Sequence, residues 1–261
     1  MISDLWAGKE EGCRRLLPPA ARWCAARVDL VELARHIELL GEAAVAGQYL
    51  VAPERLCFDG FRLPKRRLEW LGGRIAAKHA AKGLAGVGCQ AADWLRWRVE
   101  TLPSGRPVLA EWVGERAEIS ISHSGSEAVA MAAEHACGVD IQQCSERLVR
   151  VKSRFCSAVE EERLVASLPG VEIISCLNLL WAAKEAVRKA LPVTPLASFE
   201  ETELLAVGGD PPAQLVLDIC YRRRGTMTVL RCCGGLHANG YALVLTEVVA
   251  PSMDPASAER V

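Results

Sequence analysis

The stretch "CGVDIQQC", residues 137–144, places one carboxylate in an apolar run and follows it with two amides. If this run is a β-strand, Asp140 and Gln142 share one face, because successive side chains point to opposite faces. Two acids spaced in this way would hold a hard cation more firmly than one acid and one amide. A buried Asp140 needs a cation or hydrogen-bond donors. Asp140 is therefore a candidate metal ligand, and an exposed acid at a strand end is the alternative.

A second group of reactive side chains lies on "WAAKEAVRKAL". Trp181, Glu185, Arg188 and Lys189 fall in one broad sector of a helix, because steps of three and four residues stay on one face. Lys184 lies about a hundred degrees around the helix axis from Glu185. This sector is consistent with a reactive site, and equally with a solvated helix that carries an intrahelical Glu185–Lys189 ion pair.

His123 and a basic segment complete the candidate residues. His123 lies in "SISHSG", where it would contact a ligand or remain a neutral histidine bonded to the backbone. The serines around it do not form the G-x-S-x-G pattern of a hydrolase nucleophile. The tripeptide 65–67, Lys-Arg-Arg, and Arg74 suggest a phosphate clamp. A solvated basic face is the alternative for these cations.

Periodicity and turn residues predict the elements that position these side chains. Residues 19–47 are rich in Ala and Leu with a partly helical pattern, and residues 62–84 have apolar residues at helical spacing. Turn chemistry at 103–107 precedes two predicted strands around a Ser-Gly-Ser turn, and "CGVDIQ" predicts a third strand. A charged helix is expected over about 145–168, followed by the helix "LNLLWAAKEAVRKAL", which ends before a proline. The runs "AQLVLDICY", "TMTVLRCC" and "YALVLTEVV" predict strands in the last third of the chain.

The chain also contains a faint internal repeat. Trp70 and Trp181 are each followed by charged residues four and eight positions later, at an offset of 111 residues. "HSGSEAVAM" from His123 matches "HANGYALVL" from His237 at an offset of 114 residues. The two offsets agree within three residues, which predicts two related halves, each a helix followed by a His-led strand. The halves would meet near residue 135, and a ligand would bind in the cleft between them.

Composition limits the class of protein. The net charge of −1 over 261 residues provides no global field to attract nucleic acid or a membrane, and we expect neither as a partner. The acidic N-terminal residues lack the pattern of a signal peptide, and no stretch of the sequence is apolar for long enough to span a bilayer. Eleven cysteines without a CxxC pair predict free thiols in a reducing compartment, and hence a cytoplasmic protein.

In chain order, "PKRRLEWLGGRIAAKHA", "GRPVL", "SISHSG", "GVDIQ", "RFCSAVEEERL" and "WAAKEAVRKAL" closely resemble the 4′-phosphopantetheinyl transferases of the surfactin-activating (Sfp) type. The basic segment is most similar to the branch that includes the enterobactin synthase D component. The resemblance runs from about Lys65 to Leu191, with a family-like strand region after it, while residues 1–60 match only loosely. The paired motifs G-[VI]-D-[IV]-x and W-x-x-K-E-[AS], about forty residues apart, carry most of its specificity.

This resemblance implies an α+β fold, a pseudodimer of two similar α/β halves with the active site in the cleft between them. We place the N-terminal half at residues 1–134, the C-terminal half at 135–250 and a disordered tail at 251–261. The implied reaction transfers the 4′-phosphopantetheine arm of coenzyme A to a serine of an apo acyl or peptidyl carrier protein. It depends on Mg²⁺ and releases adenosine 3′,5′-bisphosphate. We expect the enzyme to be a monomer.

The resemblance also implies roles for individual residues. The metal ligands would be Asp140 and Glu185, with Gln142 contributing weakly or through water where many relatives have a third acid. Asp140, Glu185 and Lys189 would be catalytic, with Glu185 taking the serine proton directly or through a metal-bound water. The residues implied to bind coenzyme A are Arg66, Arg74, Arg106, Ser122, His123, Lys184 and Lys189. The carrier is expected to dock on residues of about 145–165, where the basic side chains are Arg147, Arg150, Lys152 and Arg154.

Two other functions are compatible with the same residues. A non-catalytic module that binds coenzyme A or a carrier protein would be weakened at Gln142 and would leave coenzyme A unchanged. A Mg²⁺-dependent pyrophosphohydrolase of nucleotides would use the same ligands with water as the nucleophile. The fate of coenzyme A separates the three functions.

Overall fold

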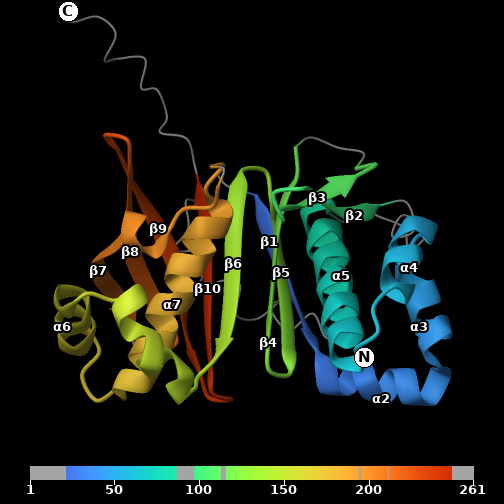
Figure 1. Ribbon diagram of the computed structural model, residues 1–261, viewed down its shortest axis with the longest axis horizontal. Helices are drawn as coiled ribbons and strands as arrows, with labels where there is room; N and C mark the ends of the chain where they lie inside the picture. Colours follow the sequence, from blue (N-terminus) through green and yellow to red (C-terminus); the bar gives the residue numbers. More distant parts are fainter. Residues whose placement is uncertain (1–21, 87–96, 113–115, 194, 211, 249–261) are drawn as a thin grey trace, which may run out of the picture.

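The computed structural model describes residues 22–86, 97–112, 116–193, 195–210 and 212–248 (Figure 1). The elements up to residue 133 are β1 (Trp23–Asp29), α2 (Leu30–Leu40), α3 (Glu42–Tyr49), α4 (Ala52–Asp59), α5 (Pro64–Ala85), β2 (Arg98–Thr101), β3 (Pro107–Ala110), β4 (Glu118–Ser124) and β5 (Glu127–Ala133). Those that follow are β6 (Ala136–Gln143), the 3₁₀ helix η2 (Glu146–Arg154), α6 (Ala158–Ser167), α7 (Ile173–Ala190), the 3₁₀ helix η3 (Phe199–Glu201), β7 (Thr202–Asp210), β8 (Gln214–Arg223), β9 (Thr226–His237) and β10 (Tyr241–Val248).

The strands form two antiparallel sheets with the same topology. The first sheet has the order β1-β5-β4-β3-β2 and the second β6-β10-β9-β8-β7, so each strand number simply rises by five. Helix α5 lies against the first sheet and α7 against the second, with the sheets between them (Figure 1). This arrangement confirms the predicted pseudodimer of α/β halves. The chain passes from one sheet to the other between β5 and β6, and the residue boundaries proposed for the halves stay a prediction. The tail predicted at 251–261 lies outside the described residues.

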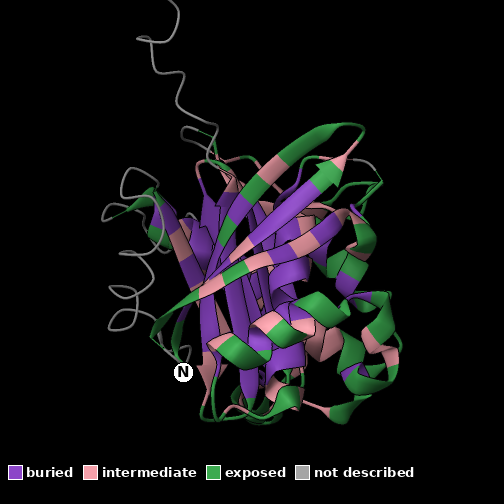
Figure 2. Ribbon diagram, turned by 90° about the vertical axis from the view of Figure 1, so that its left-hand side faces the viewer, coloured by how far each residue is buried: buried purple, intermediate pink, exposed green. Residues whose placement is uncertain are grey.

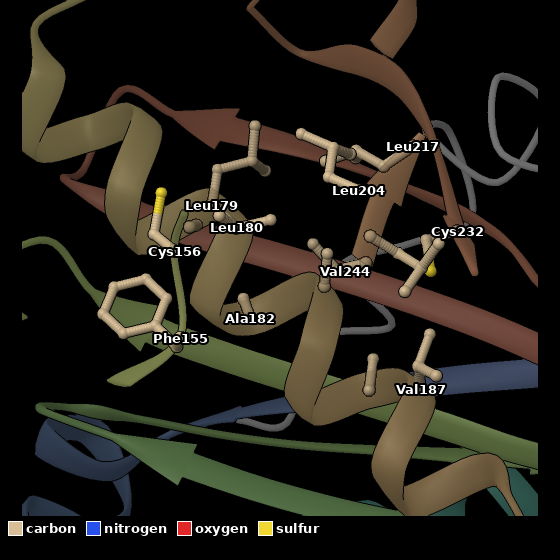
Figure 3. Close-up of a cluster of buried hydrophobic side chains, with 14 of the residues drawn as sticks. Phe155, Cys156, Leu179, Leu180, Ala182, Val187, Leu204, Leu217, Cys232 and Val244 are labelled. Carbon is tan, nitrogen blue, oxygen red and sulfur yellow. The ribbon is translucent and has the colours of Figure 1, made fainter. Parts of the chain in front are cut away.

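Three apolar clusters hold the layers together, and their buried residues lie both in the strands and in the helices that cover them (Figure 2). One cluster joins α5 to the first sheet through residues such as Leu71 and Ile75. A second joins α7 to the second sheet, and Figure 3 shows part of it. The third lies between the two sheets, where Met131 of β5 and Leu243 of β10 are buried. Burial of apolar surface on both faces of each sheet therefore fixes the position of one half on the other.

A buried ion pair occurs twice, once in each half. Lys78 of α5 pairs with Glu54 of α4 at 2.6 Å, and Lys184 of α7 pairs with Glu160 of α6 at 2.7 Å. Lys184 follows Lys78 by 106 residues, and Glu160 follows Glu54 by the same number. The structural repeat therefore matches Lys78 to Lys184. The predicted offset of 111 residues, which matched Lys78 to Lys189, is therefore wrong.

The histidine match also fails by one position. His123 lies opposite Ala128 in the β4–β5 hairpin, and His237 lies opposite Tyr241 in the β9–β10 hairpin. The second hairpin has one more residue in its turn, so the two histidines come to lie on opposite faces of their sheets. The prediction of two related halves is correct. The tryptophan match and the two histidines are out of register, whereas the strand part of the second match keeps the offset of 114 residues, because Ala130 pairs with β1 as Val244 pairs with β6.

Several predicted elements are confirmed: α5, the turn after β2, the strands β4, β5 and β6, the helix α7 and the three C-terminal strands. The helical pattern over 19–47 was misleading at its start, because 23–29 pairs with β5 along its whole length as β1. The single charged helix over 145–168 is two helices, because Ser157 begins α6 with a capping box to Glu160. Strand β7 was not predicted, since "TELLAVGGD" lacks a clear alternation.

Two observations bear on the class of protein. None of the helices in the described ranges is both long and apolar enough to cross a membrane. The nine cysteines that the structure describes are free thiols, as the sequence predicted.

Candidate active site

Asp140 lies in the middle of β6 and is only 6% exposed. Its Oδ1 accepts a hydrogen bond from the Ser122 hydroxyl at 2.6 Å and one from the Lys189 ammonium at 2.7 Å. The alternative of an exposed acid at a strand end is therefore wrong. A buried carboxylate needs hydrogen-bond donors, and here the Ser122 hydroxyl and the Lys189 ammonium supply them.

Lys189, near the end of α7, donates to acceptors on two strands, β4 and β6. Its ammonium donates to the carbonyl oxygen of Val139 at 3.1 Å and to that of Ile121 at 3.3 Å, besides its bond to Asp140. Val139 belongs to β6 and Ile121 to β4, so Lys189 contacts both halves of the molecule. Its side chain is 27% exposed, so Lys189, unlike a core lysine, reaches the surface of the site.

Glu185 lies one helical turn before Lys189 and pairs with Arg188 rather than with Lys189. The predicted intrahelical Glu185–Lys189 pair is wrong, because the lysine turns toward Asp140. Burial raises the pKa of Glu185; Arg188 opposes this shift, while the negative charge of Asp140 adds to it. Two acids from facing elements thus repel one another across the site, which favours binding of a cation between them.

A cavity of about 700 Å³ adjoins these residues, with Glu185 and Lys189 on its wall. Its other walls come from the β2–β3 turn, from β4 and from the segment after α7. Arg106 of that turn donates to the carbonyl oxygens of Lys189 at 3.2 Å and Ala190 at 3.1 Å. This arginine therefore caps the C-terminus of α7 from the other half of the molecule, where a cation also meets the helix dipole favourably. Its predicted role in coenzyme binding stays a prediction.

His123 lies next to the basic start of α5. Its Nε2 is 3.5 Å from Arg66, and its Nδ1 is 3.8 Å from Glu69. Burial lowers the pKa of His123; Glu69 opposes this shift, and the positive charges of Arg66 and Lys189 reinforce it. The structure thus brings His123, Arg66 and Lys189 into one electrostatic neighbourhood. The alternative of a histidine bonded only to the backbone is therefore wrong, because its neighbours are the side chains of Arg66 and Glu69.

The structure does not bring Lys184 or Arg74 to this group. The Lys184 ammonium is buried on another side of α7, where it donates to the carbonyl oxygens of Phe155 and Thr202 and pairs with Glu160. The prediction that Lys184 contacts coenzyme A is contradicted, because three acceptors occupy its ammonium inside the protein core. Arg74 is 8% exposed, lies over the Trp70 ring at 4.3 Å and donates to Thr101 at 3.1 Å. Its surroundings are those of a packed core cation.

Gln142 shares the face of Asp140, as the alternation of β6 predicted. Its amide nitrogen donates to the carbonyl oxygen of Gln143 at 3.1 Å, and no described residue fixes its amide oxygen through a hydrogen bond that the structure shows. Sequence reasoning missed Glu69 and the backbone carbonyl of Ile121 as neighbours of the site. Glu69 lies four residues after Lys65, so helical spacing placed it on the same basic segment.

The residues present fit a hard divalent cation. Carboxylate oxygens are the protein ligands that Mg²⁺ prefers, and it usually keeps several waters and substrate phosphate oxygens besides one or two carboxylates. Asp140 and Glu185 supply two carboxylates, and the negative charge of Asp140 adds to the burial that raises the pKa of Glu185. Within the described ranges, no cluster of three or more His, Cys, Asp or Glu side chains could hold a metal without substrate oxygens. A cation held by these two carboxylates would need further oxygens from water or from a ligand.

Comparisons with known proteins point in one direction. Residues 136–238 match the 4′-phosphopantetheinyl transferase superfamily. Holo-[acyl-carrier-protein] synthase of Exiguobacterium sp. (strain ATCC BAA-1283 / AT1b) is 38% identical over 107 residues, which cover 40% of this chain and 84% of the relative. The enzyme of the same name from Exiguobacterium sibiricum is 36% identical over 105 residues, which cover 40% of this chain and 81% of the relative.

Among solved structures, the holo-(acyl-carrier-protein) synthase from Bacillus anthracis str. Ames, in complex with CoA (3′,5′-ADP), is 25% identical. The match has a TM-score of 0.38 and covers 43% of this chain and 95% of that chain. Asp140, Glu185 and Lys189 lie within the residues that match the superfamily, whereas Arg66, Arg106 and His123 precede them. Because it is 38% identical to a relative of which it covers 84%, the chain belongs to the 4′-phosphopantetheinyl transferase superfamily and is an enzyme of that family.

Proposed function

We propose that this enzyme transfers the 4′-phosphopantetheine arm of coenzyme A to a serine hydroxyl of an apo carrier protein, with Mg²⁺ as cofactor. The observation that supports this most is the meeting of Asp140, Glu185 and Lys189 beside a cavity bounded by both halves. Adenosine 3′,5′-bisphosphate is the second product. The order and spacing of the motifs favour the Sfp-type branch.

We assign the binding of the coenzyme phosphates to Lys189, His123 and Arg66. These side chains border the buried carboxylates, and the side chain of Lys189 is 27% exposed; a phosphate would share its positive charge with the acceptors that the ammonium already meets. Asp140 and Glu185 would hold Mg²⁺, which, when bound, neutralises the negative charge of the diphosphate. The lysine and arginine then orient the diphosphate so that its leaving oxygen points away from the attacking serine.

The chemical step follows from this placement. The carrier serine oxygen attacks the phosphorus that bears the pantetheine arm, and the bond from that phosphorus to the bridging oxygen breaks. The serine proton passes to the Glu185 carboxylate, directly or through a water molecule. The adenosine bisphosphate leaves with the electron pair of the broken bond.

We propose that the carrier docks on η2, the basic 3₁₀ helix that follows β6. Arg147, Arg150 and Arg154 are exposed there, while buried Leu148 anchors the helix. Lys152 is not available in the same way, because it pairs with Glu161 at 2.7 Å. An acidic carrier would therefore meet three arginines rather than the four cations that the sequence suggested.

Charge reversal tests this surface. Arg147→Glu together with Arg150→Glu should raise the KM for the carrier roughly tenfold at low salt, with the KM for coenzyme A unchanged, because steering by these charges is lost. Lys152→Glu is the matched control and should change the carrier KM less. Equal effects of the two changes would place the docking surface elsewhere.

The function itself is tested by intact mass spectrometry. An apo carrier protein is incubated with this enzyme, coenzyme A and Mg²⁺, and its mass should increase by one phosphopantetheine group. The carrier Ser→Ala variant is the control and should stay unmodified. An unmodified carrier with intact coenzyme A would indicate a binding module, and cleaved coenzyme A without modification would indicate a pyrophosphohydrolase.

A further inference from the structure

The two halves meet where the edge of β4 lies beside the edge of β6. Side chains, rather than backbone–backbone hydrogen bonds, join these two edges. β6 is an edge strand of the second sheet. On β4, pairing with β3 involves only Glu118 among the described residues, which leaves the rest of that edge open. No backbone–backbone hydrogen bond in the described part of the chain links β4 to β6. The outward amides of β6 would be buried without acceptors if nothing else supplied them.

Three serines of β4 supply these acceptors. The hydroxyls of Ser120, Ser122 and Ser124 accept hydrogen bonds from the backbone amides of residues 139, 141 and 143, at 3.1, 3.4 and 3.0 Å. The spacing of 19 residues is the same in all three bonds, so the two strands run parallel in a single register. We call these three residues the serine ladder. Its alternating pattern is already visible in "SISHS".

Ser122 differs from the other two members of the ladder. It accepts from the amide of Ile141 and also donates its proton to Oδ1 of Asp140 at 2.6 Å. Ser122 is 7% exposed, so the Asp140 carboxylate offers it a fixed acceptor inside the protein. The resemblance to the family suggested that Ser122 binds coenzyme A, but its only proton is already given to Asp140.

The corresponding strand of the other half, β9, does not hold serines at these positions. In β9, the residue opposite Ala242 is Leu236, as His123 is opposite Ala128 in β4. The positions that correspond to the three serines are therefore 233, 235 and 237, which hold Cys, Gly and His. The ladder accompanies the side of the molecule that carries Asp140.

We propose that Ser122 is a positioning residue for Asp140, and that the serine ladder sets the register between the halves in which Asp140 faces Glu185. The hydroxyl of Ser122 holds the carboxylate in one orientation while it fixes the strand that carries it. A second carboxylate oxygen then stays free for a cation. The proposal rests on the proposed function only for the cation that Asp140 would bind. The hydrogen bonds of the serine ladder do not depend on that function.

Three variants of the full-length protein test this proposal. Ser122→Ala removes both bonds, Ser122→Thr keeps the hydroxyl, and Ser124→Ala breaks a ladder bond that does not touch Asp140. The first readout is hydrogen exchange of the segment 137–143, measured by mass spectrometry without metal or substrate. The second is binding of Mn²⁺, as a stand-in for Mg²⁺, measured by electron paramagnetic resonance with coenzyme A present.

We expect both alanine variants to speed exchange in 137–143, and only Ser122→Ala to weaken Mn²⁺ binding, by about five- to twentyfold. Ser122→Thr should restore Mn²⁺ binding to within about twofold of the parent. Equal weakening by Ser122→Ala and Ser124→Ala would overturn the positioning role, and unchanged exchange in both would overturn the ladder. If the parent enzyme failed to modify a carrier but the exchange pattern held, the proposed function would fail while the ladder stood.

Discussion

The two halves of the molecule share a framework and differ at the site. In each half a buried lysine of the long helix pairs with a glutamate in the first turn of the preceding helix. Glu54 also accepts from the amide of Val99 in β2 at 2.9 Å, as Glu160 accepts from the amide of Leu204 in β7 at 2.8 Å. The same residue types thus tie helix, helix and outer strand together twice.

The site residues that the second half contributes, such as Asp140 and Lys189, have no counterparts of the same type in the first half. When β5 is matched to β10 by its buried face, Ala26 takes the place of Asp140, because Ala26 pairs with Ala130 as Asp140 pairs with Val244. Gly83 takes the place of Lys189, and a side chain there would collide with Cys24. The difference teaches that contacts present in both halves maintain the fold, whereas the proposed site depends on residues that one half alone carries.

The largest effect is expected where the halves differ most. Asp140→Ala and Glu185→Ala should each lower the transfer rate by roughly a hundredfold or more, because no neighbour replaces either carboxylate. Thermal unfolding should show that both variants still fold. Near-normal turnover of either variant at saturating Mg²⁺ would show that the asymmetry between the halves has another purpose.

The shared ion pair makes a matched test. Lys78→Met and Lys184→Met each leave a buried glutamate without its cation, so each should cost about 3–5 kcal/mol of unfolding free energy. Urea unfolding followed by tryptophan fluorescence measures both. Burial lowers the pKa of Lys78, and the charge of Glu54 opposes that shift.

A kinetic control tests whether Lys184 contacts coenzyme A, a prediction that the buried position of Lys184 contradicts. At a temperature where the variants are folded, the KM for coenzyme A of Lys184→Met should match that of Lys78→Met. A selective rise in that KM for Lys184→Met alone would return Lys184 to the binding site, and unequal stability losses would mean that the two pairs are not equivalent.

A smaller effect is expected from an acid that only the second half carries. Glu247 of β10 takes the place of Ala133 of β5, and burial raises its pKa to about 7. A carboxyl group whose pKa is raised in the folded state prefers to be protonated there. It therefore destabilises the fold progressively as the pH rises from about 4.5 to about 7, and fully above that.

Glu247→Gln should accordingly stabilise the protein by about 1–3 kcal/mol at pH 8 and by little at pH 4. Thermal unfolding across that pH range measures the difference. Glu32→Gln, at an exposed acid of α2, is the control and should change stability by less than about 0.5 kcal/mol. A gain that does not vary with pH would mean that Glu247 does not titrate in this window.

The smallest effect concerns the position after Asp140 on the same face. Gln142→Glu adds a carboxylate beside the proposed cation, so the Mg²⁺ concentration for half-maximal rate should fall several-fold with little change in kcat. Gln142→Ala should cost little, because water replaces a weakly held amide. Loss of activity in Gln142→Ala as complete as in Asp140→Ala would show that the amide makes a specific contact.

Much of this protein followed from local patterns in its sequence. The alternation around Asp140 predicted a strand, and the spacing of Glu185 and Lys189 predicted one face of a helix. Those features depend on neighbours two to four residues apart, which the backbone geometry of strand and helix determines directly. The paired motifs then indicated the family before any contact was known.

Only the tertiary structure decided which partner each side chain meets. Lys184 and Lys189 are both lysines of one helix, yet the first enters the core beside Glu160 and the second reaches Asp140. β1 forms from Ala-rich residues because β5 offers it a pairing edge, which outweighs its helical pattern. Lys189 and Asp140 are 49 residues apart and β1 and β5 about a hundred, and such pairings depend on how the elements pack. That packing is a property of the whole chain, so no local window of the sequence contains it.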